Sequence, residues 1–290
     1  MKKFIVIYLL FAFVSVFAND MPAYKIFTSD GKEVRFANVI DNAVKADIIF
    51  FGELHNNPIA HWLEYEVTKA LYSKKHGKII LGAEMFEADN QLILDEYLHG
   101  CISEKNFLKE MRLWNNYETD YRPLVEFAKK NNITFVATNI PRRYAAIVSK
   151  SGFKGLDVLS KQAKSYIAPL PIKYDPSIGC YKKMLAMKSM PGAMGHNIEY
   201  LPQAQAIKDA TMAYFILKNF DKNKIFIHFN GAYHSDNHEG IIWHIKSIRP
   251  DIKILTISTV EQNNIDNLNK KNFAIGDFII VVDEDMTKTY

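Results

Sequence analysis

The sequence contains very little cysteine, with Cys101 and Cys180 as the only two among 290 residues. Neither has a second cysteine or a histidine at the spacing of a zinc site. A chain of this length can bury a core without disulfide cross-links. The two cysteines could pair in an oxidising compartment, and the sequence leaves open whether they lie close enough.

A strong excess of charge of one sign is also missing. The 36 basic and 32 acidic residues leave a net charge of +4, which falls to +2 when Lys2 and Lys3 are set aside with the leader. This balance gives no electrostatic footprint for nucleic acid, and we expect no nucleic-acid partner. Internal repeats and low-complexity tracts are absent, and the composition is that of one globular domain, or one domain with an insertion.

The longest hydrophobic run is too short to span a bilayer. It covers 14 residues, 4–17, whereas a membrane-spanning helix needs about 20. Lys2-Lys3 precede the run, and Val16-Phe17-Ala18 at its end supply small residues at the recognition positions, so residues 1–18 are predicted to be a cleaved signal peptide. We therefore expect export to the periplasm or cell envelope. No cysteine follows the run, so the leader does not support a lipid anchor.

Six short apolar segments predict buried strands, at 47–51, 78–82, 133–138, 225–229, 252–258 and 278–282. Helical patterns lie between them, at 60–72, 90–98, 121–130 and 209–218. This alternation predicts an α/β fold, with a mostly parallel sheet and helices on both faces. A hairpin that turns at Asp30-Gly31 is expected before the first of these strands.

Residues 143–201 break the alternation and contain no strand signal. We expect a small, mainly helical subdomain there, inserted into an α/β domain formed by residues 19–142 and 202–290. Four methionines, at positions 184, 187, 190 and 194, lie in this segment. They suit either flexible core filling or an apolar surface for a flat ligand or partner.

Polar side chains follow the predicted strands at the edge where ligands of parallel sheets bind. Gly52-Glu53-Leu54-His55 follows one strand and Gly231-Ala232-Tyr233-His234 follows another, with Glu84 after a third. Glycine allows the chain to turn sharply there, and the carboxylates and imidazoles could bind a divalent metal or transfer protons. A hydrogen-bonded cluster that only fixes the loops is the alternative.

A second candidate site is the segment from Gly195 to Leu201. His196 and Tyr200 are four residues apart and would share one face of a helix. Tyrosine can ligate haem iron, and histidine can ligate iron or hydrogen-bond a propionate. An ordinary helix start that is capped by Asn197 is the alternative here.

The chain resembles the ChaN family of haem-binding proteins that are linked to bacterial iron uptake. The match spans nearly all of the chain after the leader. It rests on these segments: 51–58 (FGELHNNP), 84–86 (EMF), Trp114 with 121–123 (YRP), 139–142 (NIPR), His196 with 203–205 (QAQ) and 208–213 (KDATMA), and 231–234 (GAYH).

The resemblance implies haem binding in iron acquisition, with haem held at a homodimer interface and its iron ligated by tyrosine; whether haem is transported, stored or sensed stays open. Tyr200 is then the first candidate for the iron ligand, His196 is its helper, and Tyr174 and Tyr181 are the alternatives. Without a Cys-x-x-Cys-His segment the haem is expected to be haem b, bound non-covalently. The expected protein partner is an outer-membrane haem receptor.

The paired Gly-x-x-His turns are also similar to those of a wider superfamily that includes erythromycin-esterase-like hydrolases and metal-dependent proteins. That resemblance implies a second hypothesis, a metal-dependent hydrolase with Glu53, His55, Glu84 and His234 as its catalytic cluster. The two hypotheses use different residues and do not exclude each other. The sequence favours a binding protein without catalytic residues over an enzyme.

Overall fold

The structure is a computed structural model that describes residues 21–186 and 198–290. The predicted signal peptide and His196 lie outside the described residues, as do Met187, Met190 and Met194.

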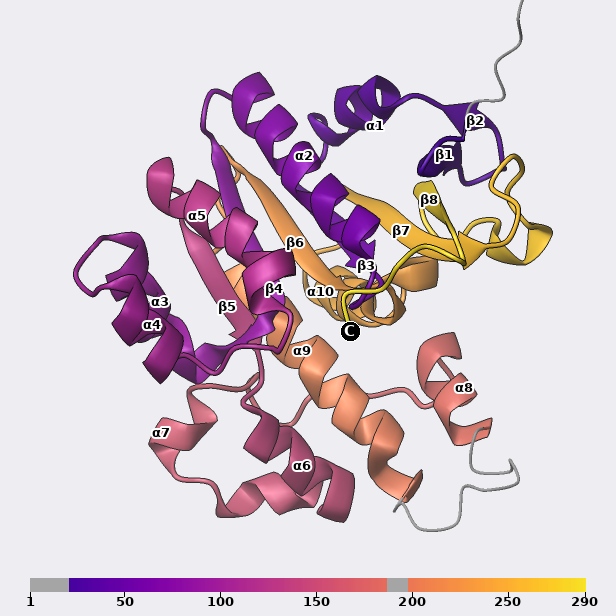
Figure 1. The fold of residues 1–290 in the computed structure, drawn as a ribbon. Coiled ribbons are helices and arrows are strands. Elements are labelled where there is room, and N and C mark those ends of the chain that lie inside the picture. Colours follow the sequence, from indigo (N-terminus) through magenta and orange to yellow (C-terminus); the bar gives the residue numbers. More distant parts are fainter. Residues whose placement is uncertain (1–20, 187–197) are drawn as a thin grey trace, which may run out of the picture.

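A single eight-stranded sheet forms the centre of the molecule (Figure 1). Its strands lie in the order β2-β1-β8-β7-β3-β6-β4-β5, and the six from β8 to β5 are parallel to one another. The bounds are β1 (Tyr24–Thr28), β2 (Glu33–Val34), β3 (Ile48–Glu53), β4 (Ile79–Glu87), β5 (Phe135–Asn139), β6 (Ile225–Gly231), β7 (Ile254–Gln262) and β8 (Phe278–Asp283). The predicted mostly parallel α/β sheet is confirmed.

The expected hairpin is also present, as β1 and β2, which pair antiparallel. Strand β1 continues the sheet by pairing antiparallel with β8. Strand β2 has only two residues, because Phe36 already begins a helix.

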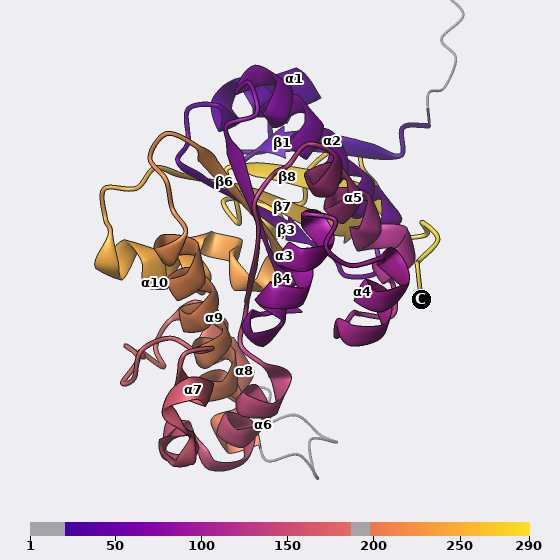
Figure 2. The same ribbon diagram turned by 90° about the vertical axis from the view of Figure 1, so that its left-hand side faces the viewer.

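Helices cover both faces of the sheet, as Figures 1 and 2 show. Their bounds are α1 (Phe36–Ala43), α2 (Pro58–Lys74), α3 (Gln91–Leu98), α4 (Glu104–Glu110), α5 (Arg122–Lys130), α6 (Arg142–Ser151), α7 (Lys161–Lys164), α8 (Gly179–Ala186), α9 (Leu201–Lys218) and α10 (Ile241–Ile248). Helix α9 is longer than the pattern predicted and begins eight residues earlier, at Leu201.

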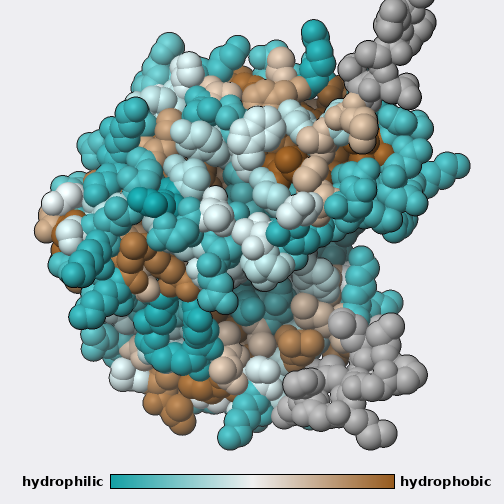
Figure 3. Space-filling model, in the orientation of Figure 1, coloured by the Kyte–Doolittle hydropathy of each residue, from teal (hydrophilic) through white to brown (hydrophobic). Residues whose placement is uncertain are grey.

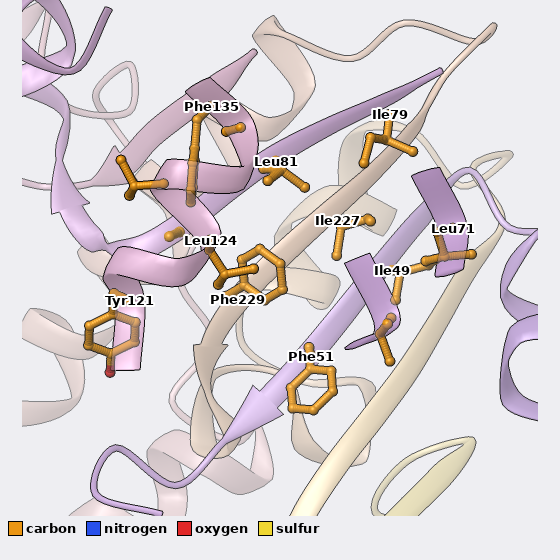
Figure 4. Packing of buried hydrophobic residues seen from close by; sticks show 14 of the residues in the cluster. Ile49, Phe51, Leu71, Ile79, Leu81, Tyr121, Leu124, Phe135, Ile227 and Phe229 are labelled. Atoms are coloured by element: carbon orange, nitrogen blue, oxygen red, sulfur yellow. The ribbon is translucent and has the colours of Figure 1, made fainter. Parts of the chain in front are cut away.

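The strands bury both faces, and this explains why their sequences do not alternate between apolar and polar residues. Ile49 and Phe51 of β3 pack in a cluster with α1, α2, α3 and α5 (Figure 4). Ile48 and Phe50 point the other way and pack in a second cluster with α9 and α10. Removing this apolar surface from water is the main stabilising contribution, at about 25 cal/mol per Å².

The described part of the segment 143–201 forms helices and turns beyond the carboxyl ends of the strands (Figures 1 and 2). Its apolar side chains, such as Tyr144, Val148 and Leu156, pack against Ala204 and Ile207 of α9 in a cluster separate from those of the sheet. Helix α9 thus contacts both this segment and the sheet. On the face drawn in Figure 3, hydrophobic areas break the mostly hydrophilic surface at several places, including the lower part, where α6 lies in Figure 1.

The two cysteines are not bonded to each other. Cys101 is exposed and Cys180 is buried on α8, and both are free thiols. Within residues 21–186 and 198–290, no helix is long and apolar enough to cross a membrane.

Candidate functional site

Chain topology brings the two Gly-x-x-His turns together. Strand β6 is inserted between β3 and β4, although β4 follows β3 along the chain. Glu53, at the end of β3, is in register with Gly231, at the end of β6. Because the three strands are parallel, their carboxyl ends meet at one edge of the sheet. His55, Glu84 and His234 therefore lie near one another, as the sequence predicted.

The glycine in each turn, Gly52 and Gly231, allows the two turns to approach each other closely. A Cβ atom on Gly231 would lie 2.7 Å from Cε1 and 2.9 Å from Nε2 of His55, and one on Gly52 would lie 2.9 Å from Cα of Ala232. Neither glycine has a positive φ angle. Neither position therefore uses the left-handed freedom of glycine; each glycine leaves room for the other turn.

Glu53 and His55 form a hydrogen-bonded pair. The His55 Nδ1–H donates to Glu53 Oε1 at 2.6 Å, and the hydroxyl of Tyr121 donates to the same oxygen at 3.2 Å. Burial acts to lower the pKa of His55, but the hydrogen bond with Glu53 and the Glu53 charge outweigh it and raise that pKa. The His55 ring is in edge contact with Trp114, at 4.8 Å between ring centroids.

A buried network behind this pair holds Glu53 in place. His61 of α2 lies 3.0 Å from the carboxylate of Glu64, 3.5 Å from that of Asp120 and 3.9 Å from that of Glu53. Burial lowers the pKa of His61, but these three carboxylates outweigh it and raise the pKa to about 9. His61 is thus a buried cation that balances part of their charge.

His234 is held between two carboxylates. Its Nδ1–H donates to Asp209 Oδ1 at 2.5 Å, and its Nε2 lies 3.1 Å from Glu84 Oε1. Burial acts to lower the pKa of His234, but Glu84 and Asp209 outweigh it and raise the pKa to about 10. The second oxygen of Glu84 accepts the backbone N–H of Gly231 at 2.9 Å. His234 is therefore an imidazolium at neutral pH, with both ring nitrogens protonated.

A cavity of about 470 Å³ opens beside this cluster. Its polar lining includes His55, Glu84 and Lys208, and Arg142 lies at its wall with its Nε donating to Glu87. The apolar lining is formed by Trp114, Ile140, Ala145, Ala146, Leu201 and Ala204. A concave, mostly apolar site with a few polar groups is typical of small-molecule binding. The cavity reaches from the Glu/His cluster to Leu201, the residue after Tyr200.

The residues of the metal-dependent hydrolase hypothesis differ in their surroundings. In the described part of the chain, no group of three His, Cys, Asp or Glu side chains is arranged to hold a metal ion. Both ring nitrogens of His234 face carboxylates, Nδ1 that of Asp209 and Nε2 that of Glu84, and His234 is not among the residues that line the cavity. Of the two histidines in this hypothesis, His55 lines the cavity and His234 does not. His55 is also hydrogen-bonded to the carboxylate of Glu53.

The three candidate tyrosines differ in their surroundings. Tyr200 ends a single 3₁₀ turn and caps α9; it is half-buried, with its ring near Gly152. Tyr181 on α8 is fully buried, and its hydroxyl donates to Asp209 Oδ2 at 2.8 Å. Tyr174 is half-buried and packs against Phe153 and Tyr181. The hydroxyl of Tyr181 is thus engaged inside the protein, which leaves Tyr200 and Tyr174 closer to solvent.

Sequence reasoning gave no role to Asp209, Lys208 or Trp114, although all three lie in segments that carry the family resemblance. Asp209 is buried and orients both His234 and Tyr181. One feature of the sequence could have indicated the role of Asp209. The charged residues Lys208 and Asp209 interrupt an otherwise apolar stretch of helix, and a buried charge there would need a partner. No sequence pattern could show that Trp114, which comes from a loop, contacts His55.

The fold and the cavity define an α/β protein with a candidate ligand site at the carboxyl edge of a parallel sheet. The family model described as "Haem-binding uptake, Tiki superfamily, ChaN" matches residues 39–245. The chain therefore belongs to this family, as its sequence motifs predicted. No curated protein matches the chain.

Solved structures share the fold at low sequence identity. ChaN of Campylobacter jejuni, described with cofacial haem binding, is 18% identical, with a TM-score of 0.64 over 89% of this chain and 96% of that one. A Bacillus cereus protein is 11% identical, with a TM-score of 0.50 over 84% of this chain and 90% of that one. A succinoglycan biosynthesis protein is also 11% identical, with a TM-score of 0.51 and the same coverage.

Proposed function

We propose that this protein binds haem b non-covalently and takes part in haem or iron acquisition in the cell envelope, with Tyr200 as the iron ligand. The observation that carries the proposal is the family match over residues 39–245. The structural likeness to the haem-binding ChaN of C. jejuni supports the same fold.

The described residues fit a haem group in three respects. Tyr200 offers an oxygen donor, which suits ferric iron, and it is half-buried rather than enclosed. The cavity that the next residue, Leu201, lines has apolar walls that suit a porphyrin, including Trp114 and Ile140. Lys208 adds a positive charge that suits a carboxylate. When bound, haem would supply an iron centre for ligation, and this chain would supply the binding surface.

Tyr200 is favoured over Tyr181 by the contacts of the two hydroxyl groups. The Tyr181 hydroxyl is buried and donates to Asp209, and burial together with Asp209 raises the pKa of Tyr181 far above its ordinary value. A tyrosine must lose its proton to bind ferric iron, so this shift disfavours Tyr181 as a ligand. Tyr174 stays as the competing candidate, and the helper role of His196 stays a prediction.

A titration with hemin tests the proposal. The full chain without its leader should give a saturable change in the visible spectrum, and Tyr200→Phe should weaken binding at least tenfold. Tyr214→Phe, on the same helix but packed beside Phe215 in the second core cluster, is the matched control and should bind as the wild type does. An unchanged free-hemin spectrum at micromolar protein would contradict haem binding, and a Tyr200→Phe titration like the wild type would contradict the ligand.

Homodimerisation on haem binding is part of the proposal. One small subdomain would leave much of an apolar haem face in water, and a second copy would cover it at about 25 cal/mol per Å². A two-fold interface brings the same segment of both chains together. Light scattering should give the mass of a monomer without hemin and of a dimer at saturating hemin. A monomer at saturation would refute the shared site.

A further inference from the structure

The charged groups that line the cavity are almost all paired with a neighbour. Glu84 is held by His234, and Arg142 donates to Glu87. His55 donates to Glu53. Lys208 is the exception: the described part of the chain provides it with no hydrogen bond and no ion pair, although its charge contributes to lowering the pKa of Glu84.

Lys208 is also placed where a ligand would meet it. It is half-buried and lines the cavity together with Leu201 and Ala204, which come from the same helix. These three residues are spaced i, i+3 and i+7, so they lie on one face of α9. Leu201 directly follows Tyr200, and Lys208 lies about 11 Å further along the helix from Leu201 at 1.5 Å per residue.

We propose that Lys208 binds a carboxylate of the ligand that occupies this cavity, namely a propionate of haem whose iron is bound near Tyr200. The inference rests on the proposed function. The Lys208 ammonium group has three N–H donors with no acceptor among the described residues, and a ligand carboxylate would accept a charge-assisted hydrogen bond from it. The apolar wall of Trp114, Ile140 and Leu201 suits the porphyrin body to which the carboxylate is attached.

The test compares three porphyrins with the wild type and Lys208→Gln. Hemin carries both iron and propionates, hemin dimethyl ester lacks free carboxylates, and protoporphyrin IX has the carboxylates but no iron. Lys208→Gln should weaken binding of hemin and of protoporphyrin IX by roughly tenfold to a hundredfold, the range of a charge-assisted hydrogen bond. It should leave the affinity for the dimethyl ester unchanged. Lys218→Gln, at the far end of α9 and outside the cavity lining, is the matched control and should bind all three porphyrins as the wild type does.

The outcomes separate this inference from the proposed function. If the wild type binds none of the three porphyrins, both fail. If hemin binds and Lys208→Gln weakens hemin and the dimethyl ester equally, haem binding stands and the propionate contact is refuted. If Lys208→Gln binds hemin as the wild type does, the contact is refuted as well. Circular dichroism of Lys208→Gln and Lys208→Met checks that the fold is kept. If the charge of Lys208 is responsible, both variants should lose the preference of the wild type for hemin over its dimethyl ester.

Discussion

The contact between His234 and Asp209 should be one of the costliest polar contacts to break. Asp209→Asn keeps the shape of the side chain and removes only its charge. The variant leaves the buried His234 cation with Glu84 alone, since Asp209 lies 2.5 Å from its Nδ1. Removing one partner of a buried ion pair costs about 3–5 kcal/mol, and we expect a value near the lower end because Glu84 stays. Urea unfolding followed by circular dichroism should show a midpoint lowered by about 1 M.

Asp251→Asn is the control for this experiment. Asp251 pairs with Arg249 at 2.6 Å but lies at the surface, where ion pairs contribute little. The free energy of unfolding of this variant should equal that of the wild type within error. If Asp209→Asn proved no more costly than Asp251→Asn, the assignment of His234 as a buried imidazolium would be wrong.

The pH dependence of stability tests the same contact. The pKa of His234 is about 10 in the folded protein and 6.5 in a model peptide. The stabilisation from its protonated form is thus complete below pH 6.5 and is lost as the pH rises toward 10. Asp209→Asn lowers the folded pKa, so its stability should fall less between pH 7 and pH 10 than that of the wild type. His61 titrates in the same range in both proteins and cancels in the difference.

Three further predictions concern other parts of the cluster and the cysteines. Gly231→Ala forces a methyl group against His55 and should lower the free energy of unfolding by about 1–3 kcal/mol, measured by urea unfolding. His55 should titrate above 6.5 in NMR spectra, and Glu53→Gln should bring its pKa down because the carboxylate charge is removed; an unchanged pKa would contradict the pairing. A thiol reagent should label Cys101 in the native protein and Cys180 only after unfolding, because Cys180 is buried and burial raises the pKa of its thiol to about 12; fast labelling of both would contradict the packing of α8.

Local patterns predicted the sheet well because its strands are buried on both faces. A run such as Ile48-Ile49-Phe50-Phe51 is apolar at every position, which is typical of a strand at the centre of a covered sheet. Strand order was not predictable from local patterns, since the insertion of β6 between β3 and β4 is decided by long-range packing. The start of α9 was missed because Leu201, Pro202 and Gln203 do not extend the apolar pattern, although proline at the first turn is a known helix signal.

The strand-end cluster was predictable as a set of residues but not as a charge network. Two Gly-x-x-His turns after parallel strands indicated that His55 and His234 would approach each other. Their different roles depend on neighbours from elsewhere in the chain, with Glu53 beside His55 and Asp209 beside His234. The pKa of His234 follows from that three-dimensional environment, which no spacing rule contains.

The ferric absorption spectrum of the hemin complex tests the central claim, haem bound through Tyr200, most directly. The wild type should show the phenolate-to-iron charge-transfer bands of a tyrosine-ligated ferric haem. Tyr200→Phe removes one oxygen and keeps the ring, so these bands should disappear, while Tyr174→Phe should keep them. A Tyr200→Phe complex with the wild-type ferric spectrum would contradict the claim.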